Sequence, residues 1–214
     1  MAGRIGERFL ALGDSYTIGE GVDPSERWPA LVAVSLRDAG VSIQEPVYVA
    51  KTGWTTEELL AALKSRPESG VFSLVSVQAG VNDQYRGYSG ERFLEGFLAL
   101  LDRAEALAGG SPSRVVAVSI PDWSVTPFAA GRDRENIAAG IDLFNSLAAS
   151  SCAGRGITWA DVTGISREHG AEEGMLAADG LHPSGAMYAL WAAALSDIFL
   201  SMLGAGGRGP RSGH

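Results

Sequence analysis

Short apolar runs alternate along the chain with longer stretches in which apolar residues recur at helical spacing. The short runs have the length of strands and are apolar throughout, which is typical of strands buried on both faces. They predict five strands, at residues 9–12, 46–50, 71–78, 114–120 and 157–162. The longer stretches predict helices at residues 29–37, 55–64, 89–107, 132–153 and 184–203.

This alternation of strands and helices predicts the fold class. Buried strands separated by helices imply a parallel sheet that is covered on each side. We therefore expect a single-domain α/β fold: a doubly wound, flavodoxin-like, five-stranded parallel sheet with helices on both faces. Thr55 followed by Glu58 predicts a capping box at the start of the second helix. Ligands bind beyond the carboxyl ends of the strands in such sheets, so the residues just after each strand are the candidates for chemistry.

The composition is that of an ordinary globular protein, and it narrows the classes of partner. Of the 214 residues, 46% are hydrophobic and 20% are charged, which is enough apolar material for a core. The formal net charge of −8 argues against nucleic acid as a partner, because a phosphate backbone is bound through clustered Lys and Arg. The single Cys152 lacks the neighbouring Cys or His residues of a zinc site, and we expect no bound metal.

The ends of the chain carry few signals. The first residues do not form a signal-peptide pattern, and we find no apolar run approaching the roughly 18 residues of a membrane span. We therefore expect a cytoplasmic protein without stable membrane insertion. Residues 204–214 are rich in Gly and are expected to form a disordered tail.

A serine follows the first expected strand, in Gly13-Asp14-Ser15. Taken alone, these residues are more simply a cap for the next segment. A serine becomes a nucleophile when a histidine takes its proton and a carboxylate orients that histidine. The chain contains three histidines, of which His214 ends the tail and His169 lies in a polar stretch expected to be a solvated loop.

The remaining histidine, His182, stands immediately before the last expected helix. Asp179 precedes it by three residues, and Gly180 supplies the backbone freedom for a tight loop that presents both side chains. The alternative is an ordinary helix entry in which Ser184 is the cap and His182 is incidental.

Two further residues follow strands and suit the stabilisation of an oxyanion. Gly53 comes after the second expected strand, and Asn82 ends the third in Gly80-Val81-Asn82-Asp83. Acyl transfer needs N–H donors aimed at the oxygen on which charge develops, commonly backbone amides together with an Asn side chain. Each residue alone is also compatible with an ordinary turn or helix cap, which is how we interpret Asp83.

Together these blocks resemble the SGNH hydrolases, also called GDSL esterases and lipases. The resemblance spans Gly13 to about Leu203 and rests on Gly-Asp-Ser, Gly53, Gly-x-Asn-Asp and Asp-x-x-His-Pro in that order. It implies an SGNH hydrolase domain at residues 1–203, followed by the tail. Tyr16 replaces the Leu of the eponymous motif. The chain has no Gly-x-Ser-x-Gly elbow, which disfavours the separate α/β-hydrolase class.

The resemblance also implies the chemistry. Ser15 would be the nucleophile, His182 the base and Asp179 its orienting carboxylate, with Ser15, Gly53 and Asn82 as oxyanion donors. The expected reaction is hydrolysis of a small-molecule carboxylic ester, or of a thioester or acetylated sugar, through an acyl-serine intermediate without metal or cofactor. Trp123 and Phe128, after the fourth strand, are expected either to line the acyl pocket or to belong to the core. The motifs fix neither acyl-chain length nor oligomeric state.

Two other functions are compatible with the same fold. A flavodoxin-like module without hydrolase activity would bind a cofactor phosphate in the loop at residues 13–21. That hypothesis gives Asp179 and His182 no role, and it places the acidic Asp14, Glu20 and Asp23 beside an anion. The second is a family member that has lost activity and serves as an interaction domain, although the expected catalytic residues are all present.

Overall fold

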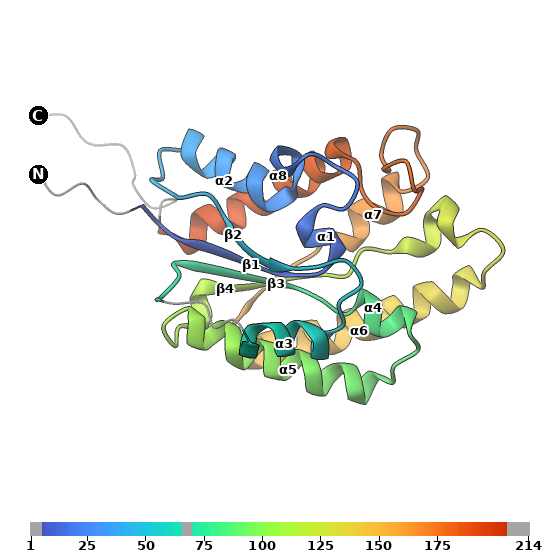
Figure 1. Ribbon diagram of the computed structural model, residues 1–214, viewed down its shortest axis with the longest axis horizontal. Helices are drawn as coiled ribbons and strands as arrows, with labels where there is room; N and C mark the ends of the chain where they lie inside the picture. The colour runs from blue at the N-terminus through green and yellow to red at the C-terminus, as the bar shows by residue number, and fades with distance from the viewer. Residues whose placement is uncertain (1–5, 66–69, 205–214) are drawn as a thin grey trace, which may run out of the picture.

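The computed structural model describes residues 6–65 and 70–204, which form a five-stranded parallel sheet between two layers of helices (Figure 1). The strands are β1 (Phe9–Gly13), β2 (Val47–Ala50), β3 (Leu74–Gln78), β4 (Val115–Val118) and β5 (Thr158–Ala160). Their order in the sheet is β2-β1-β3-β4-β5. The predicted α/β fold is confirmed.

The sheet places the first strand inside the fold. Every residue of β1, β3 and β4 is buried, whereas β2 and β5 are partly exposed because they form the two edges. Leu12 of β1 pairs with Val49 on one side and Val77 on the other. The strand order reverses between β1 and β3, so the crevice in which ligands bind opens beyond the carboxyl ends of these two strands.

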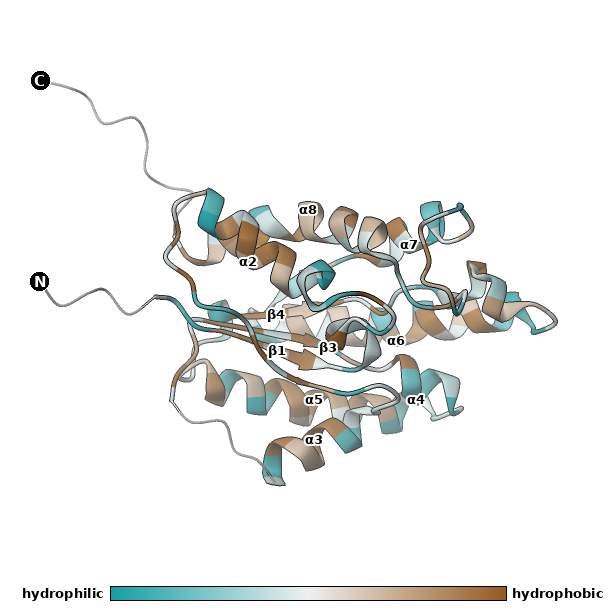
Figure 2. Cartoon of the chain, turned by 45° about the horizontal axis from the view of Figure 1, so that its top comes forward, coloured by the Kyte–Doolittle hydropathy of each residue, from teal (hydrophilic) through white to brown (hydrophobic). Residues whose placement is uncertain are grey.

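Helices cover both faces of the sheet. In Figure 1, α2 and α8 lie on one face together with α1 and α7, and α3, α5 and α6 lie on the other. The bounds are α1 (Ser15–Ile18), α2 (Trp28–Asp38), α3 (Thr56–Ser65), α4 (Val81–Tyr85), α5 (Gly90–Leu107), α6 (Arg134–Arg155), α7 (Thr163–His169) and α8 (Gly185–Met202). In the described part of the chain, four short 3-10 helices span Pro24–Glu26, Pro112–Arg114, Trp123–Val125 and Pro127–Ala129. Figure 2 shows hydrophobic residues in the strands and hydrophilic residues interspersed along the outer helices.

The last helix, α8, belongs to the core. It is the one helix in the described part of the chain that is long and apolar enough to cross a membrane, so the expectation that no stretch approaches this length is wrong. Its Tyr188, Trp191 and Phe199 are nevertheless fully buried, and the Phe199 ring lies 5.2 Å from Phe9 of β1. Packing against both β1 and α2 explains why this helix carries so many apolar residues.

The predicted elements agree with the structure except at their ends. The capping box is confirmed: the Thr55 N–H donates to Glu58 Oε2 at 2.9 Å, and the Glu58 N–H donates to Thr55 Oγ1 at 3.3 Å. The last strand is shorter than predicted, and α1, α4 and α7 were not predicted. These helices have four to seven residues, too few for a clear apolar period. The expected tail lies outside the described residues after Gly204.

Candidate active site

Ser15 begins α1 directly beyond the end of β1. Asp14 is the N-cap of this helix, and its Oδ1 accepts a hydrogen bond from the Tyr16 N–H at 3.0 Å. The chain turns sharply here because Gly13 has no side chain: a Cβ would clash with the Thr17 side chain and the Gln78 carbonyl. Ser15 is thereby presented at the crevice between the first and third strands.

The loop before α8 joins Asp179 to His182. Asp179 Oδ1 accepts the N–H groups of Leu181 at 2.9 Å and His182 at 3.0 Å, and its Oδ2 lies 2.6 Å from His182 Nδ1. Gly180 has a φ of +67°, which confirms the predicted need for a glycine. The loop is therefore folded around the carboxylate, as the sequence predicted.

The electrostatics of this pair favour one protonation state. Partial burial alone would raise the pKa of Asp179, but hydrogen bonds from His182 and from the Leu181 and His182 N–H groups outweigh burial and lower it. An ionised Asp179 fixes the imidazole proton on Nδ1, which leaves Nε2 as a proton acceptor. The ring of Tyr16 packs beside His182, with the ring centroids 5.4 Å apart.

Asn82 is the second residue of α4, not the end of a strand as the sequence suggested. Its Nδ2 donates to the Trp54 carbonyl at 2.9 Å. An Asn amide has two N–H groups, so this bond orients the amide and leaves its other N–H unused. The same bond ties α4 to the loop that follows β2.

Gly53 lies in that loop, within a tight turn. The Trp54 N–H donates to the Lys51 carbonyl at 3.2 Å, and Gly53 has a φ of +84°. This geometry is that of a type II turn with glycine at its third position. Arg86, which follows α4, donates to the Gly53 carbonyl at 2.6 Å, a contact that sequence analysis missed.

The position of Asp83 differs from the one interpreted from the sequence. The sequence suggested a cap for its own helix, but Asp83 lies inside α4 and is fully buried. Its carboxylate accepts the N–H of Thr56 at 3.0 Å and the Thr56 hydroxyl at 2.6 Å. Asp83 therefore caps α3 from across the fold, and burial raises its pKa although these two bonds partly offset the shift.

One cavity of about 210 Å³ is lined by Ser15, Gly53, Asn82 and His182. Asp179 stands behind His182. The structure thus brings together the four predicted blocks, which come from four separate segments of the chain. No hydrogen bond joins Ser15 Oγ to His182 or to any other described residue; such catalytic bonds are often long until substrate is bound.

The other wall of the cavity is aromatic. Tyr85, Trp123 and Phe128 line it, and both alternatives for Trp123 hold, because this ring is 4% exposed and also faces the cavity. Phe128 is 37% exposed, so it is a wall residue and not part of the core. Tyr85 was not predicted, since it sits on a helix too short to recognise.

The remaining histidines lie elsewhere. His169 is the last residue of α7 and not part of a loop; its Nδ1 lies 3.1 Å from Glu172 Oε1. His214 lies outside the described residues. Within the described residues, no group of three or more His, Cys, Asp or Glu side chains could hold a metal ion.

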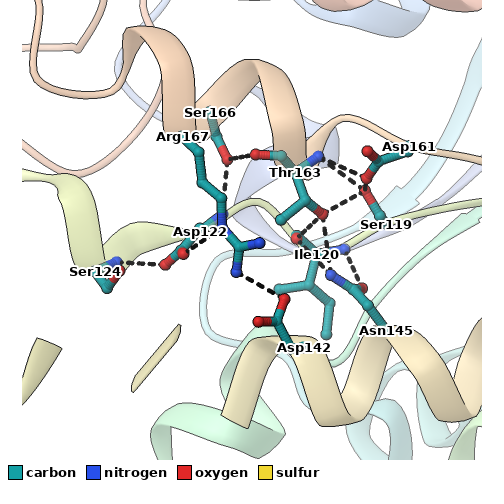
Figure 3. A network of polar contacts seen from close by, with 10 residues as sticks. All are labelled: Ser119, Ile120, Asp122, Ser124, Asp142, Asn145, Asp161, Thr163, Ser166 and Arg167. Carbon is teal, nitrogen blue, oxygen red and sulfur yellow. Dashed lines mark hydrogen bonds and ion pairs between the residues drawn. The ribbon is translucent and has the colours of Figure 1, made fainter. Parts of the chain in front are cut away.

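A second polar cluster lies beyond β4 and β5 (Figure 3). Ser119 Oγ donates to Asp161 Oδ1 at 2.8 Å and accepts the Val162 N–H at 2.8 Å. The hydroxyl and N–H of Thr163 also donate to Ser119 Oγ, at 2.8 and 3.1 Å. Arg167 bridges Asp122 and Asp142 at 2.8 and 2.7 Å. This cluster, unpredicted from sequence, anchors the loop that carries Trp123.

Solved structures with the same fold are known. The structure called TesA has a TM-score of 0.72 and 23% identity, over 92% of this chain and 99% of that one. The psychrotrophic esterase EstA from Pseudoalteromonas sp. has a TM-score of 0.68 and 17% identity, over 92% and 99%. An acetylxylan esterase from Geobacillus stearothermophilus, Axe2, has a TM-score of 0.68 and 19% identity, over 93% and 94%.

A comparison of the sequence with models of protein families assigns the chain to a family. No match was found among curated proteins. The model of the GDSL-like lipase/acylhydrolase family matches residues 11–190, which include every residue assigned above to the cavity. The chain therefore belongs to the GDSL-like lipase/acylhydrolase family, the SGNH hydrolases, and is a carboxylic ester hydrolase.

Proposed function

We propose that the protein hydrolyses small acyl esters through an acyl-Ser15 intermediate, with His182 as general base and Asp179 as its orienting carboxylate. One observation carries the proposal. Ser15 follows the first strand and His182 precedes the last helix, yet both line one cavity, and Asp179 holds His182 Nδ1 at 2.6 Å.

The reaction follows from these positions. His182 Nε2 takes the proton of Ser15 as Oγ bonds to the substrate carbonyl carbon, and Asp179 stabilises the imidazolium that forms. His182 then gives this proton to the leaving alcohol oxygen as the C–O bond breaks. Water attacks the acyl-serine in the second half, His182 accepts its proton, and the proton returns to Ser15 as the carboxylic acid leaves.

The oxyanion would be held by the Ser15 N–H, the Gly53 N–H and the second N–H of Asn82. Two hydrogen bonds link the turn to α4 and the residue after it: Asn82 of α4 donates to the Trp54 carbonyl, and Arg86 donates to the Gly53 carbonyl. Because both bonds join the same turn to the same short segment, Gly53 and Asn82 keep a fixed relative position. Such preorganised donors stabilise charge without rearrangement during the reaction.

The alternative of a phosphate-binding loop gains no support from the local packing. The space that a side chain on Gly13 would need is filled by Thr17 and Gln78, and Asp14 is buried. The loop therefore lacks the open backbone cradle on which phosphate binding depends. A purified protein that is colourless and lacks flavin absorbance would eliminate this alternative.

A substrate screen tests the proposal. p-Nitrophenyl esters from acetate to palmitate, acetylated sugars and acyl-CoA should be compared with wild type and Ser15→Ala. We expect turnover to be fastest with short acyl groups, because the cavity is small, and to disappear with Ser15→Ala. If folded wild type hydrolyses none of these esters, or if Ser15→Ala retains the activity, the proposed mechanism is wrong.

A further inference from the structure

Three aromatic rings in the cavity wall form a closed cluster. The ring centroids of Tyr85 and Trp123 lie 5.6 Å apart, those of Trp123 and Phe128 6.0 Å, and those of Tyr85 and Phe128 6.4 Å. Trp123 is fixed further, because its Nε1 donates to Gln84 Oε1 at 3.0 Å. The cluster is thus a preformed apolar surface on which an acyl chain can lie.

Arg132 lies over all three rings. Its guanidinium carbon is 5.0 Å from the Phe128 centroid, 5.4 Å from Tyr85 and 5.6 Å from Trp123. Each distance is within the range of a cation–π contact. One N–H group donates to the Tyr85 hydroxyl at 3.4 Å, so most of the five donors of the guanidinium are unused.

This arginine differs from others on the surface. Arg86 faces Glu58, Arg92 faces Glu57 and Arg155 faces Asp102, each within 3.2 Å. Among the described residues, no carboxylate lies within ion-pair distance of Arg132. The rings hold this guanidinium in place without neutralising it, and its free donors are those that bind a carboxylate through two parallel hydrogen bonds.

We propose that Arg132 and the three rings form a subsite for esters whose acyl chain ends in a carboxylate. The methylene groups lie along the rings, and the terminal carboxylate binds the guanidinium at the edge of the cavity. The proposal rests on the proposed ester hydrolysis, which supplies the reaction. It adds a substrate class: monoesters of short dicarboxylic acids.

A matched pair of substrates tests it: p-nitrophenyl hexanoate and mono-p-nitrophenyl adipate, which differ in a terminal methyl against a carboxylate. The quantity to compare is the ratio of kcat/KM for the adipate to kcat/KM for the hexanoate, after subtraction of spontaneous hydrolysis. We expect Arg132→Gln to lower this ratio about tenfold, as for the loss of a hydrogen-bonded charge pair. The loss should lie mainly in KM for the adipate, because the carboxylate is bound equally in ground state and transition state.

Two further variants make the result specific. Arg132→Lys keeps the charge without the planar pair of donors, so it should retain part of the preference. Arg114→Gln removes the same charge just before β4, at the amino end of this strand, whereas the cavity lies beyond the carboxyl ends. This variant should leave the ratio unchanged. Hexanoate turnover should stay within about twofold of wild type in Arg114→Gln, and for the two Arg132 variants the ratio of the two esters is the quantity that decides.

The outcomes separate this inference from the function on which it rests. An unchanged ratio in Arg132→Gln, with both esters turned over, overturns the subsite and leaves the hydrolase mechanism standing. An equal loss for both esters also overturns it, since Arg132 would then serve only the packing of the wall. Absence of turnover in folded wild type would instead refute the proposed hydrolysis, and the subsite with it.

Discussion

Two serines follow the carboxyl ends of parallel strands of the sheet, and only one of them suits catalysis. Ser119 follows β4 and is surrounded by partners: its hydroxyl contacts Asp161 and Thr163 (Figure 3) and the N–H of Val162, all within 3.1 Å. Ser15 follows β1, has no side-chain partner among the described residues and lines the cavity with His182. A nearby carboxylate is thus no sign of a nucleophile. The distinguishing feature is a hydroxyl left free beside a proton acceptor.

The strongest test of this comparison replaces each serine by alanine. Ser15→Ala should lower kcat by about 10⁴-fold or more and abolish labelling by a fluorophosphonate, with an unchanged unfolding transition. Ser119→Ala should keep kcat but lose about 1–3 kcal/mol of stability, because the buried Val162 N–H loses its acceptor, whereas the Thr163 N–H keeps Asp161 Oδ1. Steady-state kinetics and chemical denaturation measure both. The distinction fails if the two variants exchange these phenotypes.

The histidines allow a similar comparison. His182→Ala should lose nearly all turnover, whereas His169→Ala should keep it, because His169 contacts Glu172 at the surface and lies away from the cavity. Full activity in His182→Ala, with loss in His169→Ala, would mean that the wrong base has been assigned.

Adjacent residues of α4 should separate catalysis from stability. Asn82→Ala should lower kcat by about 10²–10³-fold at nearly unchanged KM, the usual cost of one oxyanion donor. Asp83→Ala should instead lower the free energy of unfolding by about 1–3 kcal/mol, because the buried N–H and hydroxyl of Thr56 lose their partner. Steady-state kinetics of both variants, under conditions where each is folded, and chemical denaturation measure these two effects. Normal kcat in Asn82→Ala would remove it from the oxyanion hole.

Asp14, next to Ser15, and Asp161, which contacts Ser119, should make opposite contributions to the pH dependence of stability. Burial raises the pKa of Asp14 to about 7, whereas hydrogen bonds from Ser119 and Thr163 overcome partial burial and lower the pKa of Asp161. Folded protein therefore binds the Asp14 proton more tightly than the unfolded chain does, and stability falls as pH rises through the window from about 4 to about 7. Asp161 acts in the other direction, and its contribution is present above the unfolded pKa and lost in acid.

Asp14→Asn should consequently be more stable than wild type at pH 8 by about 2–4 kcal/mol, with a smaller gain at pH 5. Asn also serves as a helix N-cap, so the hydrogen bond to the Tyr16 N–H is kept. Asp161→Asn should be less stable than wild type at pH 8. Denaturant titrations at the two pH values provide the comparison, and a gain in Asp14→Asn that does not grow with pH would contradict it.

Local sequence patterns predicted those parts of the structure whose partners are close along the chain. Runs of buried residues located all five strands, and Asp179, Gly180 and His182 form their loop within four positions. The contacts that complete the site join distant segments. Asp83 meets Thr56 across 27 residues and Arg86 meets Gly53 across 33, pairings that no local period encodes. Arg132 escaped prediction for the same reason, because its contacts with Tyr85 and Trp123 join distant segments, whereas Tyr85 was missed because α4 is too short to recognise.

The order of the site segments along the chain, with Ser15 after β1 and the Asp179–His182 loop before α8, implies an order of assembly during synthesis. The nucleophile is made with the first strand, whereas the Asp179–His182 loop is made just before α8, which then packs beside α2 and β1. A nascent chain that lacks this last segment has a serine without its base. If the proposed mechanism holds, ester cleavage is therefore expected only after the Asp179–His182 loop has been made and α8 has packed.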